Sequence, residues 1–205
     1  MNYTKNYSFG TDISRVFKNK IIDFIRKKRV IDLGCGKGIY LSYFGKNSMG
    51  LDISPKNVAL GKKRGLNIKQ ADLNNLPRIY QKFDVVFSSH VIEHLENPIS
   101  FLKYSNKLLH KNGLLILSIP NEHSLICKIY PYFNGKGNHL YSFSIRNMTE
   151  LLEFSGYKVN FIYRDYYTAL TKKLKINPFL FIIDFLPDSI KNYLSWSFWF
   201  VAEKI

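Results

Sequence analysis

The stretch Val30-Ile31-Asp32-Leu33-Gly34-Cys35-Gly36-Lys37-Gly38 decides the fold of this chain. An apolar run ends in an acid, and glycine then occupies every second position, which is typical of a buried strand passing into a ligand-binding loop. Glycine adopts positive φ without strain and has no Cβ to keep a ligand away from the backbone. Dinucleotide-binding loops place their glycines in the pattern G-x-G-x-x-G. Because Ile39 stands where that pattern needs its third glycine, the dinucleotide pattern fails here.

Four further apolar segments follow the glycine loop. They cover residues 49–52, 67–73, 83–89 and 113–121, and Asp52 and Asp72 lie at or near the ends of the first two. Between them, Ser54-Pro55 and Asn97-Pro98 each combine an N-cap residue with a proline at the first helical position. Strands that alternate with helices in this way predict an α/β fold with a doubly wound parallel sheet.

The loop Asp32-Leu33-Gly34-Cys35-Gly36-Lys37-Gly38 resembles the first motif of the class I S-adenosylmethionine (SAM)-dependent methyltransferases. The segment His90-Val91-Ile92-Glu93-His94-Leu95 and the order of the strands also resemble this family, in its small-molecule branch, over residues 29–165. The resemblance implies a Rossmann-like sheet of seven mostly parallel strands in the order 3-2-1-4-5-7-6, with an antiparallel strand 7 near residues 196–203 and helices on both faces. It also implies SAM as the cofactor and S-adenosylhomocysteine as the product. A nucleotide-binding domain with another chemistry is the alternative, because a fold alone does not fix a function.

The resemblance also indicates which residues bind the cofactor. The glycine loop would hold the methionine part, Asp52 the ribose, Asp72 and Leu73 the adenine, and the end of the fourth strand would lie beneath the sulfonium. The expected cofactor-binding residues are Asp32, Gly34, Cys35, Gly36, Gly38, Asp52, Ile53, Asp72, Leu73, Ser88, Ser89 and His90.

Candidate catalytic residues follow the fourth strand and recur later in the chain. They are His94, Glu93 and His139, of which His94 is the best candidate for a general base because imidazole titrates near neutrality. A base is needed only if the acceptor is a poor nucleophile such as a hydroxyl. His90 has an alternative role in packing beside the cofactor. For Glu93 the structural alternative, which we favour, is to accept hydrogen bonds from backbone N–H groups of its own loop.

A metal site is a further alternative. Some O-methyltransferases of the quinone and small-RNA type carry Glu-x-x-Glu-His with a later histidine and bind a divalent metal. This chain reads His90-x-x-Glu93-His94, with His123 and His139 downstream. Replacement of the first glutamate by histidine removes a hard oxygen ligand and would suit a softer metal. We expect no metal, because ligand-like residues scattered along a sequence usually do not converge.

Two segments are expected to cover the acceptor side, as a lid at residues 122–143 and as an insert at residues 166–193. The first includes the aromatic stretch 130–137, and the second includes the apolar run 178–187, which follows three lysines. This run is too short to span a membrane. It could contact a lipid surface, cap the core or form a dimer contact, and the sequence leaves these alternatives and the oligomeric state open.

Composition predicts a single domain over residues 1–205, with a basic helical segment at residues 1–28. The net charge is +15, and residues 1–29 carry eight basic and two acidic residues. This charge indicates either an anionic partner or ordinary solvated surface, and we favour the second. No RNA-binding motif occurs, so nucleic acid is not an expected partner. Because the N-terminal stretch is polar and Cys35 lies in the ligand loop, we expect no secretory leader, no disulfide and a cytoplasmic location.

The sequence therefore predicts an enzyme that transfers a methyl group from SAM to a small molecule. The expected acceptor atom is oxygen, on a sugar, a phenolic or quinone-like compound, or a lipid-like molecule. Two alternatives remain: an RNA or protein methyltransferase that uses the basic N-terminal segment, and a SAM-binding subunit or sensor without turnover.

Overall fold

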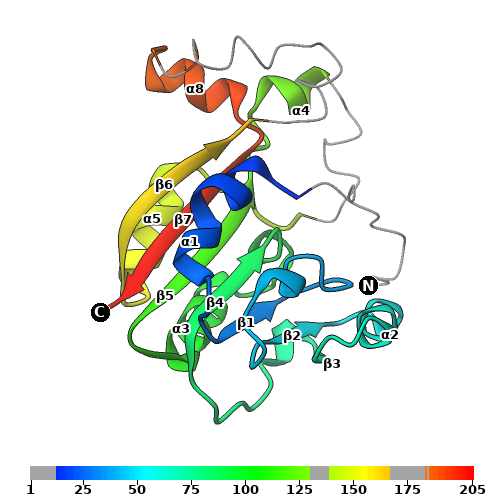
Figure 1. Cartoon of the computed structure of the whole chain (residues 1–205). Helices are drawn as coiled ribbons and strands as arrows, with labels where there is room; N and C mark the ends of the chain where they lie inside the picture. The colour runs from blue at the N-terminus through cyan, green and yellow to red at the C-terminus, as the bar shows by residue number, and fades with distance from the viewer. Residues whose placement is uncertain (1–12, 130–138, 167–182, 184) are drawn as a thin grey trace.

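A seven-stranded sheet forms the centre of the computed structural model, which describes residues 13–129, 139–166, 183 and 185–205 (Figure 1). The strand order is β3-β2-β1-β4-β5-β7-β6, with β7 antiparallel to both of its neighbours. The strands are β1 Val30–Leu33, β2 Met49–Asp52, β3 Ile68–Gln70, β4 Phe83–Ser89, β5 Leu109–Pro120, β6 Tyr157–Asp165 and β7 Ser197–Lys204. The predicted fold class and strand order are confirmed.

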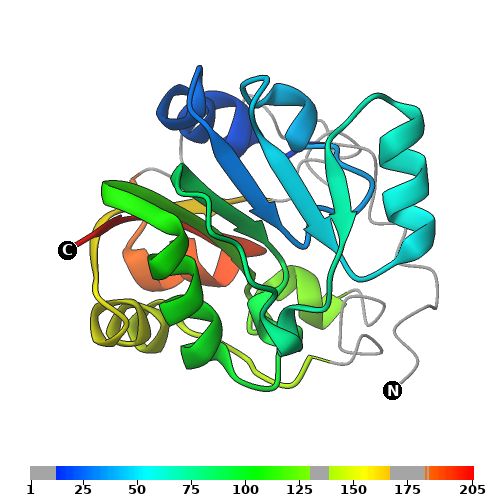
Figure 2. The same cartoon turned by 90° about the horizontal axis from the view of Figure 1, so that it is seen from below.

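Helices cover both faces of the sheet (Figure 2). α1 (Ile22–Ile25) lies on one face, and α3 (Pro98–Leu108) and α5 (Ile145–Phe154) lie on the other. Beside these, α2 (Pro55–Lys63) packs near β3, and α4 (Leu125–Ile129) contacts α8 (Asp188–Leu194).

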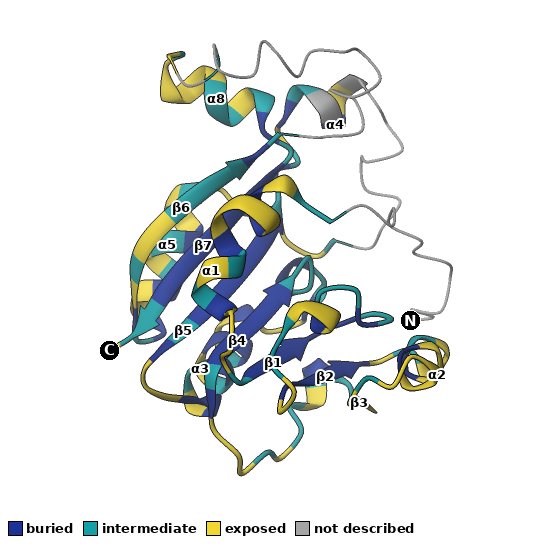
Figure 3. Ribbon diagram, viewed as in Figure 1, coloured by how far each residue is buried: buried dark blue, intermediate teal, exposed yellow. Residues whose placement is uncertain are grey.

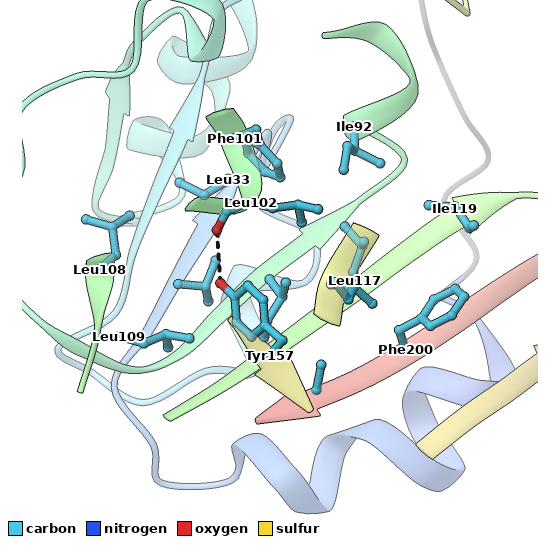
Figure 4. Close-up of a cluster of buried hydrophobic side chains, with 14 of the residues drawn as sticks. Leu33, Ile92, Phe101, Leu102, Leu108, Leu109, Leu117, Ile119, Tyr157 and Phe200 are labelled. Carbon is cyan, nitrogen blue, oxygen red and sulfur yellow. Dashed lines mark hydrogen bonds between the residues drawn. The ribbon is translucent and has the colours of Figure 1, made fainter. Parts of the chain in front are cut away.

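Alternate residues of the central strands point to two separate hydrophobic cores, as the pleat of a strand requires. On β4, Val85 and Phe87 face the α1 side, whereas Val86 faces the α3 side. The larger core lies under α3 and α5 and includes Tyr157, whose hydroxyl donates a hydrogen bond to the carbonyl oxygen of Leu102 at 3.2 Å (Figure 4). The central strands are therefore buried on both faces (Figure 3).

Polar residues cap the starts of three helices, of which those of α2 and α3 were expected from the sequence. The side chains of Ser54 and Asn97 accept hydrogen bonds from backbone N–H groups of the first turns of α2 and α3. Ser144 and Asn147 form a capping box at the start of α5, with hydrogen bonds of 3.2 Å and 2.7 Å. These caps fix where each strand-to-helix connection ends, and so position the loops between them.

The described part of the basic N-terminal segment is helical and belongs to the core. A π-helical turn at Phe17–Ile21 leads into α1, and Phe17, Ile21 and Ile25 are fully buried against the sheet. The basic side chains of Lys18 and Lys20 are exposed. The charged residues thus form the outer side of a helix that packs on β1, β4 and β7.

Three expectations are corrected or fall outside the described residues. β5 begins at Leu109, before the expected start of this segment at residue 113, and Asn112 within it has φ 60°. The aromatic stretch 130–137 and most of the apolar run 178–187 lie outside the described residues. Within the part of the chain that the structure describes, no helix has the length and apolar character needed to cross a membrane.

Candidate active site

The candidate site lies at the edge of the sheet where the parallel strands end. β1 pairs with β2 on one side and with β4 on the other. The strands that follow β1 in the chain are therefore added first on one side of it and then on the other, and the order of the strands reverses at β1. Ligands of open α/β sheets bind in the crevice at such a point. The segments that follow β1, β4 and β5 all start at this edge (Figure 1).

The glycine loop combines tight packing with one open position. A Cβ on Gly34 would lie 2.2 Å from Cγ2 of Val91, and one on Gly38 would lie 2.5 Å from Cδ1 of Leu66. Gly36 differs, because a Cβ there would meet no described atom within 4 Å although its φ is 56°. The loop is therefore packed at its two ends and leaves free space at its middle glycine, as a loop that receives a ligand requires.

Asp32 is a buried carboxylate with an unsatisfied oxygen. Its side chain is 2% exposed, and no hydrogen-bond partner among the described residues reaches Oδ2. Burial, and then the negative charge of Asp52, raise the pKa of Asp32 well above its ordinary value. A buried carboxyl group with one oxygen that has no described donor fits a ligand that brings a positive charge and N–H donors, such as the amino group of the methionine part of SAM.

Asp52, at the end of β2, joins the glycine loop to the start of α2. Its Oδ2 accepts a hydrogen bond from the N–H of Gly36 at 2.8 Å, and its Oδ1 accepts from the N–H of Ser54 at 3.0 Å and from Nδ2 of Asn57 at 3.1 Å. Ile53 beside it is 42% exposed. The carboxylate is thus held in place by three donors, and each oxygen retains lone-pair capacity for a ligand hydroxyl.

The next expected cofactor residues are structurally engaged as well. Asp72 caps the turn Leu73–Asn75, and the side chain of Leu73 is buried in the larger core. Ser88 is fully buried and donates to the carbonyl oxygen of Leu33 at 3.0 Å, which ties β4 to β1. Cys35 packs inward beside Gly50, and burial, then Asp32 and Asp52, raise the pKa of its thiol.

His90 directly follows β4 in a left-handed backbone conformation, with φ 55°. Its Nε2 lies 3.4 Å from Oγ of Ser118, and its ring stacks on Trp196 with centroids 5.2 Å apart. Nearby, Ser89 hydrogen-bonds the hydroxyl of Tyr40, whose pKa burial raises to about 12. His90 therefore lies between Ser118 of β5 and Trp196, the residue before β7, and its place beside the cofactor stays a prediction.

Glu93 does not act as expected within its loop. The N–H groups of His94 and Leu95 bond to backbone carbonyls one turn earlier, so the turn needs no side-chain acceptor. In the described part of the chain neither carboxylate oxygen of Glu93 has a hydrogen-bond partner, and the side chain is fully buried. Its Oε1 instead lies 3.6 Å from Nδ1 of His90 and 4.0 Å from Nε2 of His94. The prediction that Glu93 is a structural acceptor is therefore wrong.

The three predicted catalytic residues converge. The rings of His94 and His139 meet edge to face with centroids 4.6 Å apart. One ligand atom each from Glu93, His94 and His139 can be chosen so that all three lie within 4.8 Å of one another. Two imidazoles and a carboxylate can take a hydroxyl proton, and among the described residues they are also the group that could hold a metal ion. His123 is exposed and outside this group.

Sequence reasoning missed two residues of this site. Nδ1 of His139 lies 2.5 Å from Oε1 of Glu122, and Trp196 stacks on His90. Glu122 could have been found by the same rule as Asp52, because it follows the end of β5 by two residues. Trp196 could not, because its position depends on β7 entering the sheet beside β5.

Together, the strand order and the open glycine loop define the SAM-binding α/β class of proteins. The chain belongs to the family of methyltransferase domains, whose sequence profile matches residues 6–160. It is a class I SAM-dependent methyltransferase.

The relatives agree with this class. A ubiquinone biosynthesis O-methyltransferase of Pelagibacter ubique is 30% identical over 107 residues, which cover 48% of this chain and 44% of that protein. The match thus spans less than half the length of that relative. An uncharacterized protein of Methanocaldococcus jannaschii is 24% identical over 163 residues, covering 76% of this chain and 79% of that protein.

Solved structures share the fold. An S-adenosylmethionine-dependent methyltransferase from Mesorhizobium loti has a TM-score of 0.70 at 16% identity, covering 95% of this chain and all of that one. A SAM-dependent methyltransferase from Archaeoglobus fulgidus has a TM-score of 0.65 at 20% identity, covering 92% of this chain and 91% of that one.

Proposed function

We propose that this methyltransferase acts on a hydroxyl oxygen of a small molecule. The observation that carries the proposal is the convergence of Glu93, His94 and His139 at the edge of the sheet where the glycine loop lies. A hydroxyl is a poor nucleophile and gains from a base at this place, whereas an amine or a thiolate needs none. SAM supplies an electrophilic methyl group, whose bond to sulfur breaks with the electron pair left on sulfur.

The cofactor's polar groups have candidate partners on three strand ends. Asp32 and the backbone at Gly36 would hold the methionine part, Asp52 the ribose, and Asp72 the adenine. The remaining predicted contacts at Ile53, Leu73, Ser89 and His90 would surround the same ligand, whereas Ser88 is fully buried and would support the floor of the site from β4. His90, stacked on Trp196, would close the floor of the site near the sulfonium.

A phenolic or quinone-like acceptor is the first choice among the oxygen acceptors. The similarity to the Pelagibacter relative, a ubiquinone biosynthesis O-methyltransferase, supports it, and the match covers less than half of that protein. Sugars and lipid-like molecules remain in the proposal, because the segments 130–138 and 167–182, which would line the acceptor side, lie outside the described residues.

Two measurements test this function. Calorimetric titration with SAM, S-adenosylhomocysteine and NAD should give micromolar binding of the first two and none of NAD. Transfer of labelled methyl from SAM should then be measured against phenols, sugars and fatty acids, with added divalent metal and with EDTA. Activity that survives EDTA supports a histidine base, whereas activity restored only by metal assigns the three-residue group to a cation. Labelling of amines alone would overturn the proposal.

Two rival functions have their own signatures. An RNA or protein methyltransferase that uses the basic N-terminal segment would bind nucleic acid or protein with an affinity that falls steeply with salt. A sensor or subunit would bind SAM tightly and form no S-adenosylhomocysteine with any acceptor. We also propose a cytoplasmic location, which the two free cysteines support. Lipid contact through residues 178–187 is a further proposal, and binding of the protein to lipid vesicles would test it.

A further inference from the structure

Glu122 stands on a rigid part of the chain. It follows Asn121, whose N–H donates to the carbonyl oxygen of Trp196 at 2.7 Å. The Asn121 side-chain amide donates to the carbonyl oxygens of Asn192 and Ser195, both at 2.7 Å. These hydrogen bonds tie the end of β5 to the segment that leads into β7. The carboxylate of Glu122 therefore starts from a fixed backbone position.

His139 is fixed from the opposite side of the site. The N–H groups of Leu140 and Tyr141 donate to the carbonyl oxygen of Glu93, at 2.8 Å and 3.3 Å. The hydroxyl of Tyr141 donates to the carbonyl oxygen of Glu96 at 3.0 Å. The residue after the undescribed stretch is thus docked on the turn that carries Glu93 and His94, and its imidazole lies between that turn and Glu122.

The contact between Glu122 and His139 selects one tautomer. An ionised carboxylate only accepts hydrogen bonds, so at 2.5 Å from Oε1 the Nδ1 atom of His139 must carry a proton. A neutral imidazole has a single N–H, which leaves Nε2 with the lone pair. The His139 side chain is 16% exposed and that of Glu122 30%, so the pair is partly shielded from water.

We propose that Glu122 is a positioning residue that makes His139, rather than His94, the proton acceptor of the site. The inference rests on the proposed function, because it assigns the base for a hydroxyl acceptor. In the transfer step, the acceptor hydroxyl gives its proton to Nε2 of His139 while its oxygen forms the bond to the methyl carbon. The imidazolium that results lies against the Glu122 carboxylate, which stabilises it by a charge-assisted hydrogen bond. His94 packs against the ring and helps to hold its orientation.

The first test reads the tautomer without any acceptor. Protein labelled with nitrogen-15 in histidine should show a protonated Nδ1 and an unprotonated Nε2 for His139 at a pH where the imidazoles are neutral, with the signals assigned by their loss in His139→Gln. Glu122→Ala should shift His139 to the Nε2–H tautomer that free histidine prefers. A wild-type His139 protonated at Nε2, or a spectrum unchanged by Glu122→Ala, would overturn the proposal.

The second test reads the rate, with protocatechuate as the hydroxylated probe. Glu122→Gln should lower kcat by roughly 10- to 100-fold, as loss of a partner that orients a histidine typically does, and should leave the Kd for SAM unchanged. Glu122→Asp should recover part of the rate. Glu153→Gln, on the exposed side of α5, is the matched control and should keep the wild-type rate. A Glu122→Gln enzyme with the wild-type kcat contradicts the inference.

The two proposals can fail separately. If protocatechuate is not methylated, this compound is not an acceptor, and the tautomer spectrum still decides whether Glu122 orients His139. If protocatechuate is methylated and His139 has the wrong tautomer, the function stands and the assignment of the base falls.

Discussion

Two buried aspartates lie at the same edge of the sheet and differ in how many hydrogen bonds their carboxylate oxygens accept. Asp52 accepts three hydrogen bonds from the glycine loop and from α2, whereas Oδ2 of Asp32 has no partner among the described residues. A buried carboxylate oxygen without a hydrogen-bond donor is costly in the folded protein. Such a cost is expected where a ligand supplies the missing charge. Replacement of Asp32 should therefore raise the stability of the protein and weaken its binding of the ligand.

Asp32→Asn should stabilise the protein without ligand and weaken SAM binding. The neutral amide removes the desolvation of the charge and its repulsion with Asp52, so the midpoint of thermal unfolding at pH 7 should rise. SAM affinity should fall by roughly 10- to 100-fold, since a hydrogen bond to a charged group is worth about 1.5–3 kcal/mol. Calorimetry measures both effects. Asp23→Asn loses the same charge from an exposed ion pair and should change neither.

The pH dependence has a defined sign. The pKa of Asp32 is raised in the folded state above its ordinary value of 3.8, so over the interval between the two values the folded protein binds more protons than the unfolded chain. The free energy of unfolding contributed by this group therefore falls as the pH rises through that interval. The stability advantage of Asp32→Asn should accordingly be larger at neutral pH than near pH 4. An advantage that grew on acidification would contradict the assignment.

At the scale of elements, the connections after the strands carry the site, and their geometry is set by short signals. The open space at Gly36 and the close packing at Gly34 and Gly38 give the β1 connection its shape. The turn after β4 is a single helical turn, Ile92–His94, preceded by the left-handed His90. A pattern of residues predicted both connections, but the burial of the Glu93 carboxylate beside His90 and His94 is a tertiary feature that only the structure gives.

Gly36→Ala tests whether this loop receives the cofactor. The methyl group meets no described atom within 4 Å, so the cost of a Cβ at positive φ, about 1–2 kcal/mol, should be the whole stability effect. The methyl should also occupy ligand space, and SAM affinity should drop at least tenfold by titration. Gly65→Ala has the same kind of φ and the same open surroundings away from the site. It should match the loss of stability and keep the wild-type Kd. Equal SAM affinity in both variants would remove the loop from the cofactor site.

At the scale of the whole molecule, the basic N-terminal segment is part of the structural core in its described portion. Phe17 is fully buried, with its ring centroid 4.6 Å from that of Tyr40 and 5.8 Å from that of Phe87. Tyr40 follows the glycine loop and Phe87 lies on β4, so this helix supports the strands that form the site. The described basic side chains Lys18 and Lys20 of this segment therefore lie on the outer side of a structural element.

Phe17→Ala should destabilise the protein by about 3–5 kcal/mol, the usual cost of removing a buried aromatic ring. Lys20→Ala, on the exposed side of the same helical segment, should change stability by less than about 0.5 kcal/mol. Denaturant unfolding followed by circular dichroism measures both. A Phe17→Ala protein as stable as the Lys20→Ala protein would mean that the helix is not part of the core and would strengthen the rival function based on a free basic segment.

The sequence by itself determined the class of this protein. The glycine spacing, the strand ends at Asp52 and Asp72, and the caps at Ser54 and Asn97 are local signals, and local signals survive in a single sequence because each depends on neighbours a few residues away. These signals predicted the α/β fold, and the family resemblance that they carry predicted the strand order and the cofactor.

Only the tertiary structure decided how the catalytic groups meet. Glu122, His139 and Trp196 lie far apart in the chain, and they come together because β7 inserts beside β5 and because the segment after residue 138 docks on the turn at Glu93. Such contacts depend on strand order and on long-range hydrogen bonds, which no short pattern encodes. For the same reason the sequence favoured a structural role for Glu93, whereas the folded chain leaves its carboxylate buried beside two histidines.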